Sequence, residues 1–367
     1  MRAVTAYPGG DRGMPMGRWC GLLLVSLLLG PTAAGAEILL PPGFSAEVYV
    51  TGRGFDPDTG RASRGIPATS TIAVDQAGVL FLARTARRYT GGEVEDLWPV
   101  YRVPVGGARL TPESEARYFH GPPLRNPQIA AVRNSRELFV STFDRERQIG
   151  VLYRLLDGYA TLLAGGTPEP GAPPLLKQPE AAAVDGAGRV YVADRQQGVV
   201  VRLDASGQVL DARWLSVKRP RLLALGARDH LWIGADGEAE APWQRGPGEI
   251  WTVSPEGAAR LALRGPVAAG MAVSPGGHLF VADRHETQLF VLGPDGERAP
   301  FARFTDGDLP RGIAFAPVTP ETQRAGIAGD MFVVIINRNA WPVNEVLRIS
   351  GPFADFVRGR LPAGGDR

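Results

Sequence analysis

Arginine and aspartate stand side by side at several corresponding positions of this sequence. Asp194-Arg195 and Asp283-Arg284 follow similar apolar segments, and Asp144-Arg145 follows another. An arginine fork binds a carboxylate, a phosphate or a quinone oxygen, while carboxylates bind cations or sugar hydroxyls. The same pairs can also cap tight turns and bridge neighbouring segments. These residues alone therefore leave both a ligand site and a structural role open.

The elements that position these pairs recur six times along the chain. Each copy has an apolar strand, a turn containing Gly or Asp, an apolar residue followed by an aromatic one, and a second apolar strand. The aromatic residues are separated by 58, 52, 41, 48 and 52 residues, which leaves room for four short strands per repeat. They are Phe81, Phe139, Tyr191, Trp232, Phe280 and Phe332.

This repeat predicts an all-β fold, a six-bladed β-propeller formed by residues 37–367 as one domain. A single twisted sheet cannot cover both of its faces, whereas six sheets packed radially bury each face against a neighbour. The segment Phe44–Val50 belongs to no complete repeat, so we expect it to close the ring by joining the last blade beside Val346–Ile349. An open β-sandwich fits the number of strands but not their regular spacing.

In such a ring the first strand of each blade lines a central channel, and function is expected where these strands begin. Glu180, Arg221 and Arg311 stand at that position without a matching residue in the other repeats, so they are the favoured ligand contacts. His120 and His285 fall near the same rim and, with Glu180, are the candidate catalytic residues. A surface position is the alternative for both histidines.

The first 36 residues have the pattern of a cleavable signal peptide. Arg2, Arg12 and Arg18 form a basic region, an apolar run of 11 residues ends at Leu29, and Ala34-Gly35-Ala36 is a small-x-small cleavage site. The apolar run is too short to span a membrane as a helix. We therefore expect a periplasmic or secreted protein that starts at Glu37 and has no stable membrane span.

Removal of this segment changes the charge and the cysteine content of a 367-residue chain that is 44% hydrophobic. Three arginines and one aspartate are lost, which leaves 37 basic and 37 acidic residues. A nucleic acid partner is therefore not expected. The single cysteine, Cys20, leaves as well, so the remaining chain has no thiol or disulfide chemistry. Zinc motifs, phosphate-binding loops and the Gly-x-Ser-x-Gly elbow are absent from the sequence.

Two segments, Ala183–Arg195 and Ala272–Arg284, resemble NHL repeats, which build six-bladed propellers. The resemblance extends over most of the predicted propeller and implies the fold rather than a reaction. It is compatible with a propeller that binds a small molecule or a protein at its rim without chemistry of its own.

Leu40–Tyr49 and Leu124–Gln128 resemble segments of the soluble glucose and sorbosone dehydrogenases, which use pyrroloquinoline quinone and calcium. The resemblance implies that Arg125 and Asn126 contact the quinone. Arg221 and Arg311 are further candidates for cofactor binding because of their position at the strand entries. A Pro-containing loop before a strand explains the same Arg-Asn-Pro sequence.

The chain also resembles gluconolactonase and regucalcin, which hold a divalent metal with Glu, Asn and Asp side chains on the channel axis. On the lactonase hypothesis, the carboxylates of the rim, Glu180, Asp194 and Asp283, are the candidate metal ligands. The Asn-Gly that usually begins one inner strand is replaced by Gly270-Met271 in this sequence. A binding propeller, a quinone-dependent sugar or aldehyde dehydrogenase and a metal-dependent lactonase therefore remain as three hypotheses.

Overall fold

The computed structural model describes residues 38–55, 62–64, 66–67, 69–84, 97–111, 113–132, 135–144, 146–240, 244–293, 296–305, 308–336, 343–354 and 356. The predicted signal segment lies outside these residues. Residues 35–367 form one compact unit, which contains all of the described elements. No helix in the described ranges is long and apolar enough to cross a membrane.

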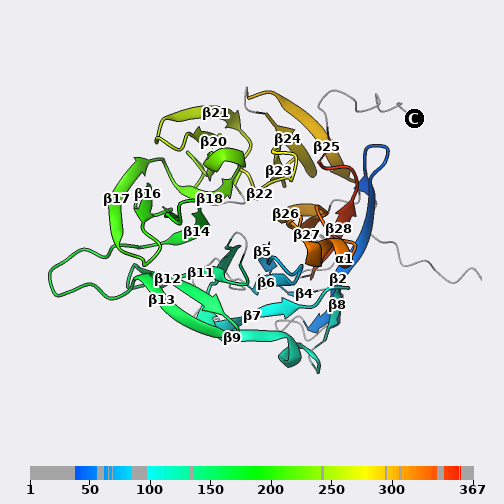
Figure 1. The fold of residues 1–367 in the computed structure, drawn as a ribbon, viewed down its shortest axis with the longest axis horizontal. Helices are drawn as coiled ribbons and strands as arrows, with labels where there is room; N and C mark the ends of the chain where they lie inside the picture. Colours follow the sequence, from blue (N-terminus) through cyan, green and yellow to red (C-terminus); the bar gives the residue numbers. More distant parts are fainter. Residues whose placement is uncertain are drawn as a thin grey trace, which may run out of the picture. The chain divides into compact units, whose positions relative to one another are not determined.

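Six sheets, antiparallel except for the pairing of β2 with β8, stand around a common axis, which confirms the predicted six-bladed β-propeller (Figure 1). Blades 1 to 3 each have four strands, which follow one another from the axis outward. Blade 1 contains β5 (Thr69–Val74), β6 (Leu80–Arg84), β7 (Leu97–Val103) and β9 (Phe119–Arg125); blade 2 contains β10 (Gln128–Ala131), β11 (Leu138–Asp144), β12 (Ile149–Leu156) and β13 (Tyr159–Gly165); blade 3 contains β14 (Pro179–Val184), β15 (Val190–Asp194), β16 (Val199–Leu203) and β17 (Val209–Ser216).

Blades 5 and 6 carry additional strands. Blade 4 contains β18 (Pro220–Leu225), β19 (Leu231–Ala235), β20 (Gly248–Val253) and β21 (Ala259–Gly265); blade 5 contains β22 (Gly270–Val273), β23 (Leu279–Asp283), β24 (Gln288–Leu292), β25 (Arg298–Phe304) and β1 (Ile38–Leu39); blade 6 contains β26 (Leu309–Phe315), β27 (Met331–Ile336), β28 (Val343–Ser350) and β2 (Ser45–Phe55), joined by β3 (Ala62–Arg64), β4 (Ile66–Pro67) and β8 (Ala108–Leu110).

Strand β2 closes the ring by joining blade 6, as the sequence predicts. Strand β2 is antiparallel to β28, with Val50 opposite Val346 and Ala46 opposite Ile349. Arg348 of β28 contacts the Glu47 carboxylate of β2 at 3.0 Å. The first and last parts of the chain therefore share blade 6, and β2 covers the outer edge of β28.

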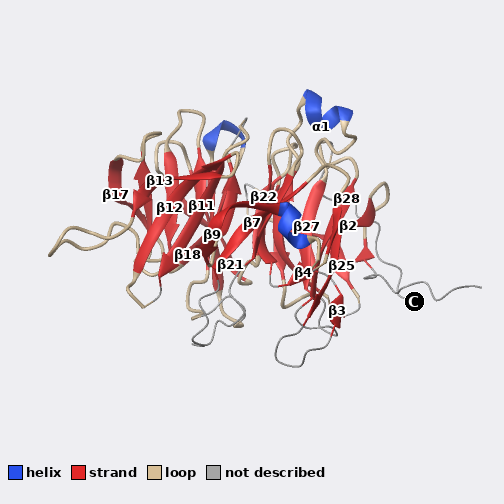
Figure 2. Ribbon diagram, turned by 90° about the horizontal axis from the view of Figure 1, so that it is seen from below, coloured by secondary structure: helices blue, strands red, loops and turns tan. Residues whose placement is uncertain are grey.

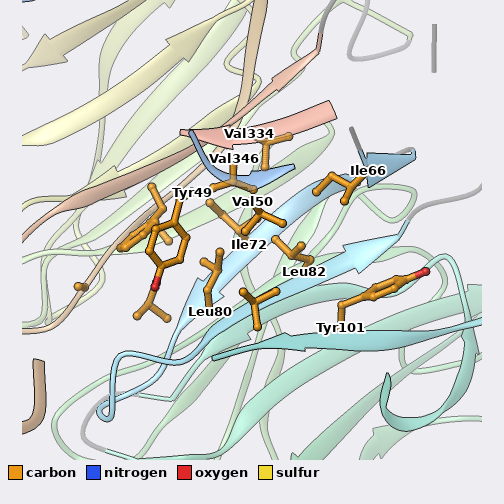
Figure 3. Close-up of a cluster of buried hydrophobic side chains, with 14 of the residues drawn as sticks. Tyr49, Val50, Ile66, Ile72, Leu80, Leu82, Tyr101, Val334 and Val346 are labelled. Carbon is orange, nitrogen blue, oxygen red and sulfur yellow. The ribbon is translucent and has the colours of Figure 1, made fainter. Parts of the chain in front are cut away.

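Six clusters of buried hydrophobic side chains hold the blades together, one at each interface between neighbours. Each cluster contains one of the six repeated aromatic residues, packed against a neighbouring blade. Figure 3 shows the cluster between blades 6 and 1, where Tyr49 and Val50 of β2 lie with Ile72 and Leu82 of blade 1. The repeated aromatic residues are therefore structural anchors.

The turns between first and second strands explain another part of the repeat. Asp75 Oδ1 accepts hydrogen bonds from the Ala77 and Val79 amides, and Asp185 Oδ1 does the same for Ala187 and Arg189. Gly78 lies in the first of these turns with a φ of 81°, a conformation that favours glycine. We call this end of the blades the hairpin rim.

Three short helices complete the described structure: η1 (Glu115–Tyr118), η2 (Ala227–Asp229) and α1 (Pro320–Arg324). Helix α1 lies between β26 and β27 of blade 6 and stands at the hairpin rim, at the top of Figure 2. Its N-terminus is capped by Thr319, whose hydroxyl accepts a hydrogen bond from the Thr322 amide.

Candidate functional site

A cavity of about 230 Å³ lies on the propeller axis and is lined by the inner strands of all six blades. Ten of the 22 residues that line it are alanine or glycine, which keeps space open where the strands converge. Among these lining residues, only Thr71 and Glu180 have polar side chains. The Thr71 hydroxyl already accepts a hydrogen bond from the Ile129 amide, so Glu180 is the more available polar contact.

The inner strands begin at the end opposite the hairpin rim, which we call the entry rim; it carries Gln128, Glu180, Arg221, Gly270 and Arg311. The pairing of β14 with β15 runs from Pro179–Asp194 to Ala181–Ala193, so Glu180 is the extra residue of a β-bulge. Arg221 is the extra residue of β18 in the same way. A bulge changes the direction in which a side chain points. Glu180 and Arg221 therefore depart from the regular alternation of side chains along their strands.

Glu180 is enclosed by polar groups from blades 3 and 4. Its Oε1 accepts a hydrogen bond from the Gln178 side-chain amide at 2.5 Å. Burial raises the pKa of Glu180 above its ordinary value, and the positive charges of Arg221 and Arg195 act in the opposite direction. The described residues provide no hydrogen-bond partner for Oε2. Since Glu180 lines the cavity, this carboxylate is placed to contact a ligand there.

Asp236 joins two arginines beside Glu180. Its Oδ2 lies 2.9 Å from Arg195 Nε, and its Oδ1 lies 2.7 Å from Arg221 Nε. Arg195 also donates to the Glu240 carbonyl at 2.6 Å, and Arg221 donates to the Ala268 carbonyl. The Asp236 side chain is 1% exposed. The Arg195–Asp236–Arg221 triad is therefore a buried, fixed ion-pair group that links blades 3 and 4.

The other aspartates of the entry rim cap loops. Asp194 accepts hydrogen bonds from the Lys177, Gln178 and Gln197 amides and from the Gln197 side chain. Asp283 accepts from the His285 and Glu286 amides, and its other oxygen contacts Arg298. The turn-capping interpretation of the Asp-Arg pairs is confirmed for these two aspartates.

The predicted metal ligands are not gathered into one group. Glu180 faces the axis, whereas the carboxylates of Asp194 and Asp283 are directed to the amides of their own loops. Within the described ranges, no three His, Cys, Asp or Glu side chains come together in a way that could hold a metal ion. The residues present therefore do not fit the metal site that the lactonase resemblance implies.

The predicted quinone contacts lie on the entry rim but do not line the cavity. Arg125 ends β9, and its guanidinium pairs with Asp144 at 2.9 Å. Asn126 follows in the left-handed region, at a φ of 46°, in the turn from blade 1 to blade 2. Arg311 donates to the Thr69 carbonyl at 3.3 Å and so links blade 6 to blade 1. These arginines therefore take part in contacts between or within blades.

Neither candidate histidine lines the cavity. His120 is on β9, the outermost strand of blade 1, where its ring lies 5.4 Å from that of Phe81 and burial lowers its pKa. His285 follows β23, and its Nε2 donates to the Gln244 carbonyl at 2.9 Å. The structure does not bring either histidine together with Glu180.

Two residues that shape the site are not apparent from the sequence. The sequence pattern distinguishes neither Asp236 nor Gln178 as a site residue, yet Asp236 holds the two arginines and Gln178 holds Glu180 in place. The cavity could be recognised in the sequence from the alanines of the first strands, such as Ala181 and Ala272, because small residues recur where the strands meet.

Comparisons with known proteins identify the fold. No family model matches the sequence, and a search of curated proteins finds no match. Among solved structures, a gluconolactonase from Xanthomonas campestris is 15% identical, with a TM-score of 0.53 over 86% of this chain and 96% of that chain. An aldose sugar dehydrogenase from Streptomyces coelicolor, solved with its quinone bound, is 12% identical, with a TM-score of 0.52 over 84% and 99%. A protein of unknown function from Bacteroides thetaiotaomicron is 12% identical, with a TM-score of 0.54 over 86% and 76%.

Proposed function

We propose that this chain is an exported β-propeller that binds a small molecule in its axial cavity and contacts it through Glu180. The observation that carries the proposal is the cavity itself, which is lined by all six inner strands and has one ionisable side chain in its lining. A mostly apolar hollow with a few polar groups is the usual form of a small-molecule site. The proposal assigns binding and no reaction.

Calcium and pyrroloquinoline quinone are not part of this proposal. Two of the three carboxylates expected to bind a metal are hydrogen-bonded to loop amides, and Arg125 is paired with Asp144. The likeness to the gluconolactonase and to the sugar dehydrogenase supports the fold alone, since both are less than a fifth identical to this chain.

A cavity-filling variant tests the proposal. Ala269 lines the cavity, so Ala269→Leu should occupy the space of a ligand while keeping the ring intact. Ala212→Leu, on the exposed outer strand β17, is the matched control. We expect small molecules found by ligand-observed NMR on the wild-type protein to bind the control equally and to lose binding to Ala269→Leu. Binding that is unchanged in a folded Ala269→Leu protein would place the site elsewhere and contradict the proposal.

A further inference from the structure

The charges around Glu180 restrict what the cavity can bind. Arg195 and Arg221 carry two positive charges, and Asp236 and Glu180, when ionised, carry two negative ones. These four side chains form a group with no net charge, the quartet. Asp194, the next carboxylate on the rim, already accepts hydrogen bonds from the Lys177 amide before β14 and the Gln197 amide of the following loop.

The arginines of the quartet are bonded to other groups of the protein. Arg221 Nε is bound to Asp236 and its Nη2 donates to the Ala268 carbonyl, while Arg195 is bound to Asp236 and to the Glu240 carbonyl. Neither arginine lines the cavity, whereas Glu180 does. A ligand therefore meets a carboxylate rather than a guanidinium.

We infer that the site takes an uncharged molecule with a hydroxyl group, which donates a hydrogen bond to Glu180 Oε2, and that it discriminates against the corresponding carboxylate. This inference rests on the proposed function. A carboxylate would place a second negative charge beside Glu180 where little water screens it, and a cation would leave the balanced quartet with an excess positive charge. A neutral donor satisfies Oε2 and leaves the charge balance unchanged.

Three probes with the same carbon skeleton test the inference: cyclohexylmethanol, cyclohexanecarboxylate and cyclohexylmethylamine. Their affinities are measured by NMR titration at a pH where Glu180 is ionised, on the wild-type protein, on Glu180→Gln and on Glu256→Gln. Glu256 is exposed in the turn between β20 and β21, so its substitution removes the same charge away from the cavity. Thermal unfolding of each variant establishes that it is folded.

For the wild-type protein and Glu256→Gln, we expect the alcohol to bind at least about tenfold more tightly than the carboxylate. In Glu180→Gln the remaining triad has one net positive charge, so the preference should reverse in favour of the carboxylate. A wild-type protein that prefers the carboxylate or the amine would overturn the inference and leave the proposed function intact. Absence of binding by all three probes to every protein would count against the proposed function itself.

Discussion

At the level of single residues, the entry rim shows that the partners of a carboxylate decide its role. Asp194 and Glu180 lie on adjacent strands at the same end of blade 3. Two amides of the segment before β14 and two donors of Gln197 in the following loop satisfy Asp194, whereas Glu180 has one side-chain donor and lines the cavity. The first is therefore a loop cap and the second is available to a ligand.

The raised pKa of Glu180 leads to a pH dependence of stability. Because the native state holds this proton more tightly than the unfolded chain, the contribution of Glu180 is full below its ordinary pKa of 4.5 and is lost as the pH rises through the raised value. We expect the free energy of unfolding of the wild-type protein, minus that of Glu180→Gln, to fall as the pH rises above 4.5. Urea unfolding of both proteins across this range measures the difference. A constant difference would show an unshifted pKa, and a difference that grows with pH would show that the neighbouring arginines stabilise the carboxylate more than burial penalises it; either result would contradict the prediction.

At the level of elements, the ring depends on a strand that is far in sequence from its partner. Strand β2 supplies the outer part of blade 6 and contributes Tyr49 and Val50 to the cluster between blades 6 and 1. Arg348 contacts Glu47 on one side and Asp330 on the other, so β28 is also linked by charge to β2 and to the residue before β27. Closure therefore combines backbone pairing, apolar burial and an ion-pair group.

Two valines of β2 provide a matched test of this closure. Val50 is fully buried, whereas Val48 on the same strand is 45% exposed. We expect Val50→Ala to lower the free energy of unfolding by about 2 kcal/mol because it leaves a cavity in the cluster. Val48→Ala should change it by no more than about 0.5 kcal/mol. Equal effects of the two substitutions in denaturant unfolding would show that packing of β2 on blade 1 does not hold the ring closed.

At the level of the whole molecule, the cavity is a product of the ring. Each blade supplies only one wall, and the inner strands of all six are needed to enclose the axial space. Ala181 belongs to blade 3 and Ala269 lies at the start of blade 5. These two small residues line the same cavity only when the ring has closed. Ligand binding should therefore depend on the folded ring and not on any single repeat.

The whole chain also has a predicted processing step. We expect the full-length protein, expressed in a bacterium, to be recovered from the periplasm or the medium with Glu37 as its first residue, because Ala34-Gly35-Ala36 fits a signal peptidase site. Mass spectrometry of the intact protein identifies the first residue. Ala36→Arg should block cleavage and leave the longer chain, and recovery of an uncleaved wild-type protein that starts at Met1 would contradict the prediction.

The sequence by itself determined the number of blades and the strand that closes the ring. These features follow from local patterns: strand and turn residues repeat about every 50 residues, and an unmatched N-terminal strand must pair somewhere. Only the tertiary structure decided which polar side chains are available. In the sequence, Asp194 and Glu180 are both carboxylates, and Arg125 and Arg221 are both guanidinium groups. Their roles differ because bulges, loop amides and neighbouring blades give each side chain different partners. Hydrogen-bond partners distant in sequence set these roles, so local spacing could not reveal them.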